Sequence, residues 1–232
     1  MSSETSATVE NDSNISETKN SQESEVLLSQ ESAKYDPLTA VYEKLRHSED
    51  SEELHKFARR VLPDRNNQAA FSRATALLEA VAGNSYTPEE DRIYLATTMP
   101  FPNILVKLSE DSSDAVRLAV AKNTNAKNWL VGRLTKDSCP EVRDAALCNP
   151  KASWKMRLEG AQCDGVGAKT LQYLASLGVS EEENAPVVLA TMVRRAVALN
   201  PGVSQQTLQT LCNDKESDVY LAARSRFKRV AS

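Results

Sequence analysis

Apolar residues recur along most of this chain at the three- and four-residue spacing that predicts amphipathic α-helices. The first such segment follows Asp36-Pro37, a pair that suits the start of a helix. A second segment begins near Ser51, and a third runs over about 67–82. We expect these three helices to form an N-terminal helical cap within residues 36–86, because a repeat array needs its first apolar face covered.

Beyond the expected cap, the apolar and charged positions repeat together at a fixed interval. The pairs that lie 26 residues apart are Leu108 and Leu134, Asp111 and Asp137, Val116 and Val142, Arg117 and Arg143, and Asn123 and Asn149. A third copy contains Val193, Arg194 and Asn200, and Val219 again lies 26 residues after Val193. A period of this length is typical of stacked structural repeats, so we expect an all-α repeat solenoid over residues 87–232.

Each repeat is predicted to be a pair of short helices with Asn at the turn between them. The first helices are expected over about 114–122, 140–148 and 186–199, and the second over about 127–135, 151–160 and 204–212. Asn tolerates the left-handed conformation that ends a helix, and Pro150 and Pro201 cannot continue one. Thr87 and Glu90 predict a capping box at the start of the array.

A degenerate unit is expected between the second and third clear copies. Gly165, Gly167 and Gly178 loosen the pattern there. Ser180 followed by three glutamates predicts another capping box and a helix that restarts at this point.

Composition agrees with small, closely packed helices. Of the 232 residues, 41% are hydrophobic but only 5% are aromatic. Residues 1–35 are rich in Ser and Glu, and we expect a disordered acidic tail because such a segment buries too little apolar surface to offset its ordering entropy. The apolar cluster at Val26–Leu28 is either a short docking motif or part of a solubilising tail.

The closest copy of the repeated pattern is Leu134–Pro150, LTKDSCPEVRDAALCNP. It resembles the variant leucine-rich repeats, a family that is similar to HEAT repeats. The resemblance covers roughly residues 90–230 and implies a right-handed superhelix of short helix pairs with a concave face. Some members carry an amino-terminal iron–sulfur cluster. No cysteine precedes Cys139, so we do not expect one here.

The repeated Asp and Arg residues lie six positions apart, as Asp111 with Arg117 and Asp137 with Arg143. In HEAT-like arrays such a pair resembles a ladder, in which the carboxylate caps the next helix and the guanidinium reaches a neighbouring unit. The alternative is that these arginines, with Arg194 and Arg195, line a groove for phosphate groups.

Catalytic and metal chemistry find little support in the chain. The histidines are His47 and His55 alone, the four cysteines lie far apart, and no phosphate-binding loop or nucleophile motif occurs. We therefore expect a protein that is not an enzyme and has no cofactor and no metal site. No apolar stretch approaches membrane-spanning length, which together with the cysteine usage predicts a cytoplasmic protein with reduced thiols.

Two functions remain, and the oligomeric state stays open. The preferred hypothesis is a scaffold that binds another protein through the solenoid surface. The alternative is a nucleic-acid-binding protein with a basic concave face, since residues 116–232 hold 17 Lys and Arg against 11 Asp and Glu. The candidate partner-binding residues are Trp129, Arg133, Lys151, Trp154, Lys155, Arg157, Arg194 and Arg195.

Overall fold

The computed structural model describes residues 36–231, with side chains up to Lys228, and this part of the chain is all-α. The predicted disordered tail over 1–35 lies outside the described residues. The thirteen helices of the described part are α2 (Leu38–His47), α3 (Ser51–Ala58), α4 (Gln68–Ala82), α5 (Glu89–Thr98), α6 (Pro102–Leu108), α7 (Asp114–Lys122), α8 (Asn128–Leu134), α9 (Pro140–Leu147), α10 (Trp154–Gln162), α11 (Ala168–Ser176), α12 (Val187–Leu199), α13 (Gln205–Leu211) and α14 (Ser217–Ala231).

Backbone contacts divide the chain into residues 1–44 and 45–232. The boundary falls inside α2, and the described part of the first unit is the start of that helix. The predicted cap over 36–86 and solenoid over 87–232 are a different division, based on the repeat pattern, and stay predictions.

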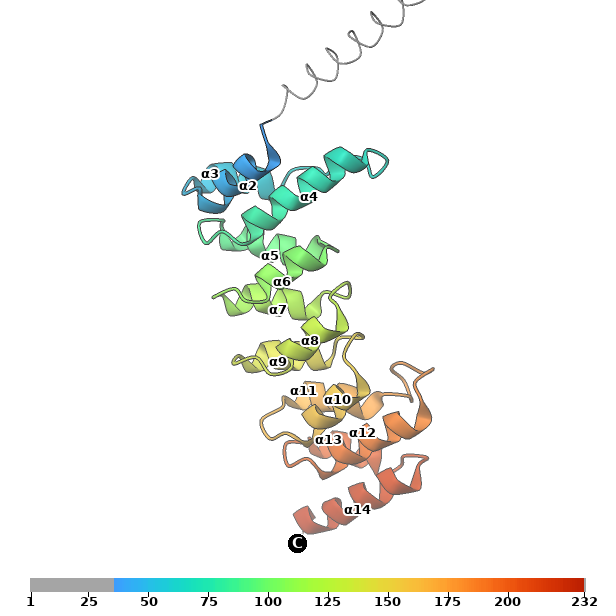
Figure 1. The fold of residues 1–232 in the computed structure, drawn as a ribbon. Helices are drawn as coiled ribbons and strands as arrows, with labels where there is room; N and C mark the ends of the chain where they lie inside the picture. Colours follow the sequence, from blue (N-terminus) through green and yellow to red (C-terminus); the bar gives the residue numbers. More distant parts are fainter. Residues whose placement is uncertain (1–35, 232) are drawn as a thin grey trace, which may run out of the picture. The chain divides into compact units, whose positions relative to one another are not determined.

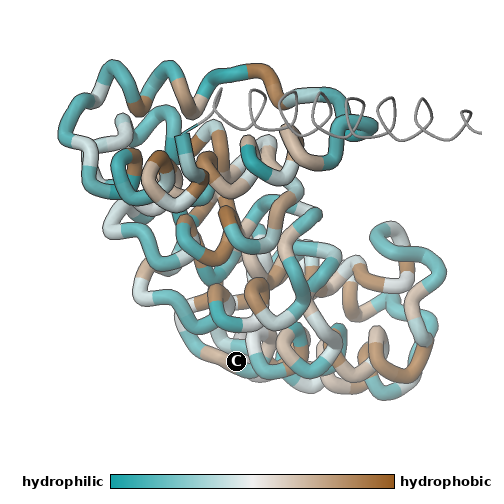
Figure 2. Tube along the Cα trace, turned by 45° about the horizontal axis from the view of Figure 1, so that its top comes forward, coloured by the Kyte–Doolittle hydropathy of each residue, from teal (hydrophilic) through white to brown (hydrophobic). Residues whose placement is uncertain are grey.

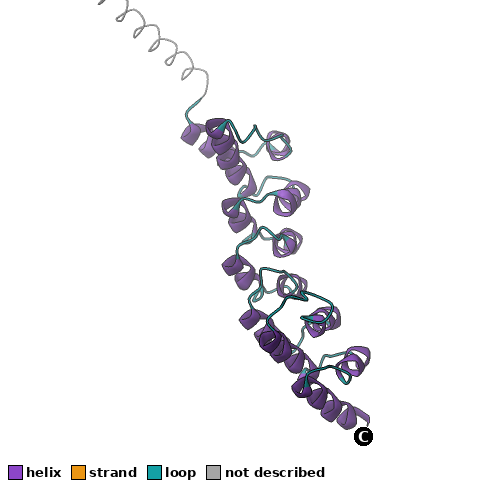
Figure 3. Ribbon diagram, turned by 90° about the vertical axis from the view of Figure 1, so that its right-hand side faces the viewer, coloured by secondary structure: helices purple, strands orange, loops and turns teal. Residues whose placement is uncertain are grey.

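Within residues 45–231 the helices follow one another in chain order, as expected of a repeat array (Figure 1). Seen from the side, they form two rows joined by loops (Figure 3). In one stretch α5 packs against α7 and α7 against α9, and in a second α10 packs against α12 and α12 against α14. Contacts of α9 with α10 and α11 are sparser. The array therefore consists of two well-packed stretches with a less regular junction.

The repeated valines account for the packing. Val116, Val142, Val193 and Val219 are all buried, one in each of α7, α9, α12 and α14. Hydrophobic and hydrophilic residues alternate within the helices and are not gathered in one segment of the chain (Figure 2). Each helix therefore contributes one apolar side to a core that runs through the array.

Serine side chains begin several of these helices. Ser113, Ser153 and Ser204 each accept a hydrogen bond from a backbone N–H of the first turn, of α7, α10 and α13 respectively. The predicted capping box at α5 is wrong: Pro88 is the N-cap residue, and the Thr87 hydroxyl donates instead to the Val81 carbonyl at 2.6 Å.

The repeated asparagines do not adopt the left-handed conformation that we predicted. Asn123 and Asn200 are extended, with φ of −72° and −69°. Their buried side-chain amides bind backbone carbonyls instead: Asn123 donates to Ala96 at 2.8 Å, and Asn200 donates to Ala161 at 2.8 Å. Asn149 donates in the same way to Ala121, at 2.7 Å. Asn recurs because its amide joins consecutive units through buried hydrogen bonds.

The degenerate middle also differs from expectation. A helix, α11, forms over Ala168–Ser176, while the predicted restart at Ser180 does not occur and α12 begins at Val187. The intervening loop contains a parallel bridge between Leu177 and Glu181, and Glu182 has a φ of 45°. Among the described residues, no helix is both long and apolar enough to cross a membrane.

Candidate functional site

Ion pairs between an arginine and an acidic residue of the next loop join consecutive units. Arg117 Nε lies 2.9 Å from Asp137 Oδ2, twenty residues ahead. The same arrangement joins Arg92 to Asp111 and Arg194 to Asp214, each at 2.8 Å. All of these side chains are largely buried. The predicted ladder residue Arg117 thus pairs forward to the next unit, and Asp111, six positions earlier, contributes only its backbone to Arg117.

Arg117 illustrates how one guanidinium holds a loop. Its Nη1 donates to the Asp111 carbonyl at 2.7 Å, while Nε and Nη2 bind both oxygens of Asp137. Asp137 also accepts from the backbone N–H of Cys139 at 2.9 Å. Burial disfavours the charged carboxylate, but these hydrogen bonds outweigh it and lower the pKa of Asp137. The pair therefore fixes the loop before α9.

Arg143 occupies the equivalent position in α9 but makes only the contacts with backbone carbonyls. Its Nη1 donates to the carbonyls of Asp137 and Ser138, at 2.7 and 2.9 Å. Among the residues that the structure describes, no carboxylate pairs with it. The ladder of ion pairs is interrupted here, at the junction between α9 and α10.

Beyond the junction, Arg157 of α10 restores the pattern with a different partner. Its guanidinium binds both oxygens of Glu182, at 2.8 and 2.5 Å, and Tyr173 donates to the same carboxylate at 3.1 Å. Hydrogen bonding by Arg157 lowers the pKa of Glu182, and burial raises the pKa of Tyr173 to about 12. The Trp154 ring packs 4.9 Å from the guanidinium carbon. This network ties the irregular loop before α12 to α10.

Burial separates the predicted partner-binding residues into two groups. Arg157 and Arg194 are only 1% and 4% exposed, and their guanidinium groups bind Glu182 and Asp214. Trp154 is half-buried against the core around α12. Because these three side chains serve intramolecular contacts, we give them no place in the candidate partner-binding surface.

Trp129, Arg133 and Lys151 lie near one another at α8. Trp129 is 56% exposed, and Arg133 follows it by one helical turn. The Asn128 amide donates to the Lys151 carbonyl at 2.8 Å, which brings Lys151 beside the start of this helix. Arg133 pairs with Glu110 at 2.6 Å and also bonds to Ser109. An exposed tryptophan with Arg133 one turn away and Lys151 beside the start of the helix is therefore one candidate surface.

A second candidate surface covers the outer side of α12. The exposed side chains there are Val187, Val188, Leu189, Met192, Arg195 and Leu199. Of these, only Arg195 was among the predicted site residues. The others were missed because a helix rich in Val, Leu and Ala predicts burial on all sides. The signal that could have revealed them is the four- and three-residue spacing of Val188, Met192, Arg195 and Leu199.

Lys155 lies on the exposed side of α10, which packs against α12. Its ammonium group is 3.9 Å from Glu159 one turn later, a long and solvent-exposed pair. Leu158, between them, lines a groove with Met192 and Arg195. The structure thus places Lys155 at the margin of the α12 surface.

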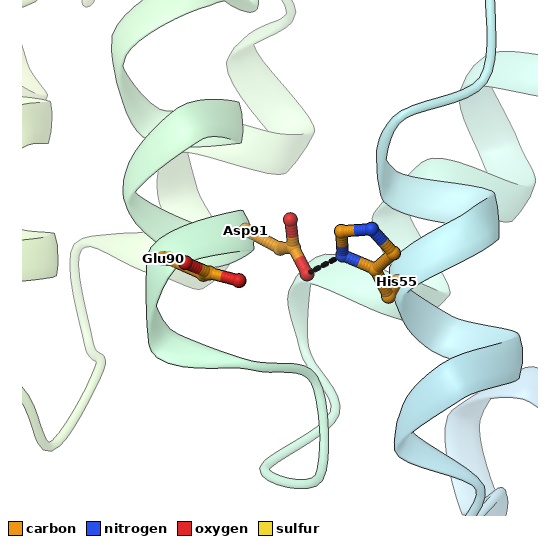
Figure 4. A group of neighbouring side chains, drawn as sticks. All are labelled: His55, Glu90 and Asp91. Carbon is orange, nitrogen blue, oxygen red and sulfur yellow. Dashed lines mark hydrogen bonds and ion pairs between the residues drawn. The ribbon is translucent and has the colours of Figure 1, made fainter.

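One cluster resembles a metal site in composition. His55, Glu90 and Asp91 each place a potential ligand atom within 4.8 Å of the others (Figure 4). Both oxygens of the buried Asp91 are engaged, by His55 Nδ1 at 2.8 Å and by Arg59 Nε at 2.6 Å. A guanidinium at this distance opposes a second cation. We therefore interpret the cluster as a polar contact between α3 and α5, at a position where later repeats bury a valine.

A scan with protein-family models and searches of curated proteins and of solved structures found no match to this chain. The fold and the two candidate surfaces are therefore the basis for a functional hypothesis.

Proposed function

We propose that this protein is a non-enzymatic scaffold that binds another protein through the outer surface of α12. The support comes from the distribution of exposed apolar side chains. Five of the eleven large hydrophobic residues that are exposed in the described part of the chain belong to α12, and three of them, Val188, Met192 and Leu199, share one face of the helix. Apolar side chains gathered on one surface are typical of protein interaction sites.

The proposed architecture is a right-handed α-solenoid of the HEAT-like or variant leucine-rich repeat type, in the cytoplasm. Support comes from the two rows of short helices and from residues that perform the same task in successive units. These are the buried asparagine amides and the forward arginine–carboxylate pairs. Solenoids present long rigid surfaces that bind partners without chemistry.

Two of the four cysteines, Cys139 and Cys148, lack the low thiol pKa of a catalytic nucleophile. A hydrogen bond to Glu141 raises the pKa of Cys139, and burial raises the pKa of Cys148. A nucleophilic cysteine needs the opposite shift, because the thiolate is the reactive form.

The test compares the partners captured by the tagged full-length protein with those captured by two variants. The first is Met192→Asp with Leu199→Asp. The control is Ala115→Asp with Lys122→Gln, at the equivalent positions of α7 and with the same change in net charge. We expect the first variant to lose at least one specific partner that the wild type and the control retain. Identical partners for all three would contradict the proposal.

The second candidate function is nucleic-acid binding through the surface around Trp129. The observation that favours it is the exposed indole with Lys127 and Lys151 nearby, since bases stack on aromatic rings and phosphates bind lysines. Single- and double-stranded nucleic acids are titrated with the full chain at several salt concentrations. Salt-sensitive binding that Lys127→Glu with Lys151→Glu abolishes would favour this function, and no binding at low salt would eliminate it.

A further inference from the structure

Four of the exposed residues of α12 form a single stripe. Val188, Met192, Arg195 and Leu199 lie four, three and four positions apart, which places them on one face of the helix. Val188, Met192 and Leu199 are 71, 46 and 49% exposed. We call these four residues the α12 stripe. The opposite side of the helix is buried in the core, so α12 is apolar on both sides.

The spacing within the α12 stripe is that of a helix that packs along another helix. Alternating intervals of four and three residues form the apolar seam of coiled coils, in which each side chain inserts between residues of the facing helix. With thirteen residues, α12 is about 20 Å long, enough for three turns of a partner helix.

A groove beside the stripe can receive side chains of such a helix. It lies between α10 and α12, has a volume of about 240 Å³, and is lined by Leu158, Ala161, Met192, Ala196 and Leu199 among others. The two alanines let a second helix approach closely, while the larger residues provide apolar contact. The equivalent groove between α5 and α7 has a volume of about 320 Å³ and is also lined largely by apolar residues. There α7 has Ala115, Leu118 and Lys122 in place of Met192, Arg195 and Leu199, so the groove at α12 differs by its arginine and its larger apolar side chains.

Arg195 determines the charge of the occupant. It lies in the middle of the α12 stripe, helix α12 contains no acidic residue, and Arg195 forms no ion pair within the part of the chain that the structure describes. Covering the stripe with an entirely apolar surface would leave a desolvated, unpaired guanidinium, which is strongly unfavourable. A carboxylate opposite Arg195 removes this penalty and provides specificity.

We propose that the α12 stripe receives an amphipathic helix of a partner protein, with apolar residues at heptad spacing and an Asp or Glu facing Arg195. This inference rests on the proposed scaffold function and names the chemistry of the partner.

The test uses a displayed library of helical peptides. Apolar residues occupy the heptad positions, and the central seam position is fully randomised. The library is selected against the full-length protein, Arg195→Glu, Met192→Asp with Leu199→Asp, and the α7 control Ala115→Asp with Lys122→Gln. Circular dichroism verifies that each variant is folded. Arg195 is exposed, so its charge reversal does not disturb the core.

The wild type and the α7 control are expected to enrich Asp and Glu at the central position, by about tenfold over Lys and Arg. Arg195→Glu should reverse this preference, and the Met192 and Leu199 variant should enrich no peptide. Failure to enrich peptides, or a preference that persists in Arg195→Glu, would overturn the inference. If cellular partners still depend on Met192 and Leu199 in that case, the scaffold proposal stands and only the helical acidic occupant is rejected.

Discussion

Arginine–carboxylate pairs join neighbouring units both in the stretch from α5 to α9 and in the stretch from α10 to α14. The sequence spacing of the paired residues is more regular in the first stretch than in the second. In the first, Arg92 and Arg117 pair with Asp residues 19 and 20 positions ahead. In the second, Arg194 pairs 20 positions ahead, but Arg157 reaches Glu182, 25 positions away, across an irregular loop. An inter-unit ion pair is thus retained although the sequence period is not.

The two stretches differ most on their exposed sides. At the equivalent position of the outer face, α7 has Lys122 and α12 has Leu199. Interior contacts are therefore repeated along the array, while α12 exposes larger apolar side chains than α7 and has Arg195 in place of Leu118. This difference suggests that the first stretch is mainly structural and that the second binds the partner.

The largest effect on stability is expected at the irregular pair. Glu182→Gln keeps the shape of the side chain but leaves the guanidinium of Arg157 buried without a counter-charge, which should lower the free energy of unfolding by about 3 kcal/mol. The exposed neighbour provides the control, since Glu183→Gln should change stability by less than about 0.5 kcal/mol. Denaturant titration measures both. Equal effects would show that the pair does not stabilise the second stretch.

Smaller losses of stability are expected at two arginines that occupy equivalent positions of the first stretch, and the losses should differ between them. Arg117→Ala leaves the largely buried Asp137 carboxylate without its cation, so we expect a loss of about 2 kcal/mol. Arg143→Ala removes only bonds to two carbonyls and should cost about 1 kcal/mol or less. Thermal and denaturant unfolding provide the comparison. A larger loss for Arg143 would mean that the ladder continues across the junction.

Acid should weaken both stretches through the same mechanism. The pKa values of Asp137 and Glu182 are lowered in the folded protein from ordinary values of 3.8 and 4.5. As the pH falls, the unfolded chain therefore takes up protons before the folded protein does. The stabilisation that these two carboxylates provide is complete above about pH 5 and is lost as the pH falls through their lowered pKa values. Unfolding followed between pH 6 and pH 2 should show this loss, and Glu182→Gln should show less of it. Stability independent of pH in this range would contradict the role of both pairs.

The sequence predicted the regular helices well because their signals are local. Leu, Val and Asn at a 26-residue interval located α7, α8 and α9 to within about one residue at each end. The role of Asn123 was not predictable, since its partners lie in the preceding unit, at Ala96 and Met99. Tertiary contacts of this kind have no local signal.

The candidate site was less predictable than the fold. Arg157 looked like a surface cation because its partner, Glu182, lies in a loop for which a helix was predicted. Met192 and Leu199 looked like core residues because apolar composition does not show which side of a helix remains uncovered. Packing between units was the preferred interpretation of Trp129 from the sequence, and the structure shows it exposed; its role in binding a partner stays a prediction.

The most direct test of the central claim is site-specific photo-cross-linking in cells. A benzophenone amino acid is placed in turn at Met192 of α12, at Ala115 of α7 and at Trp129 of α8, and cross-linked products are compared. The account predicts a discrete protein adduct from position 192 and none from position 115. Adducts from 115 and 192 alike, or nucleic-acid adducts from 129 alone, would contradict the assignment of α12 as the partner-binding surface.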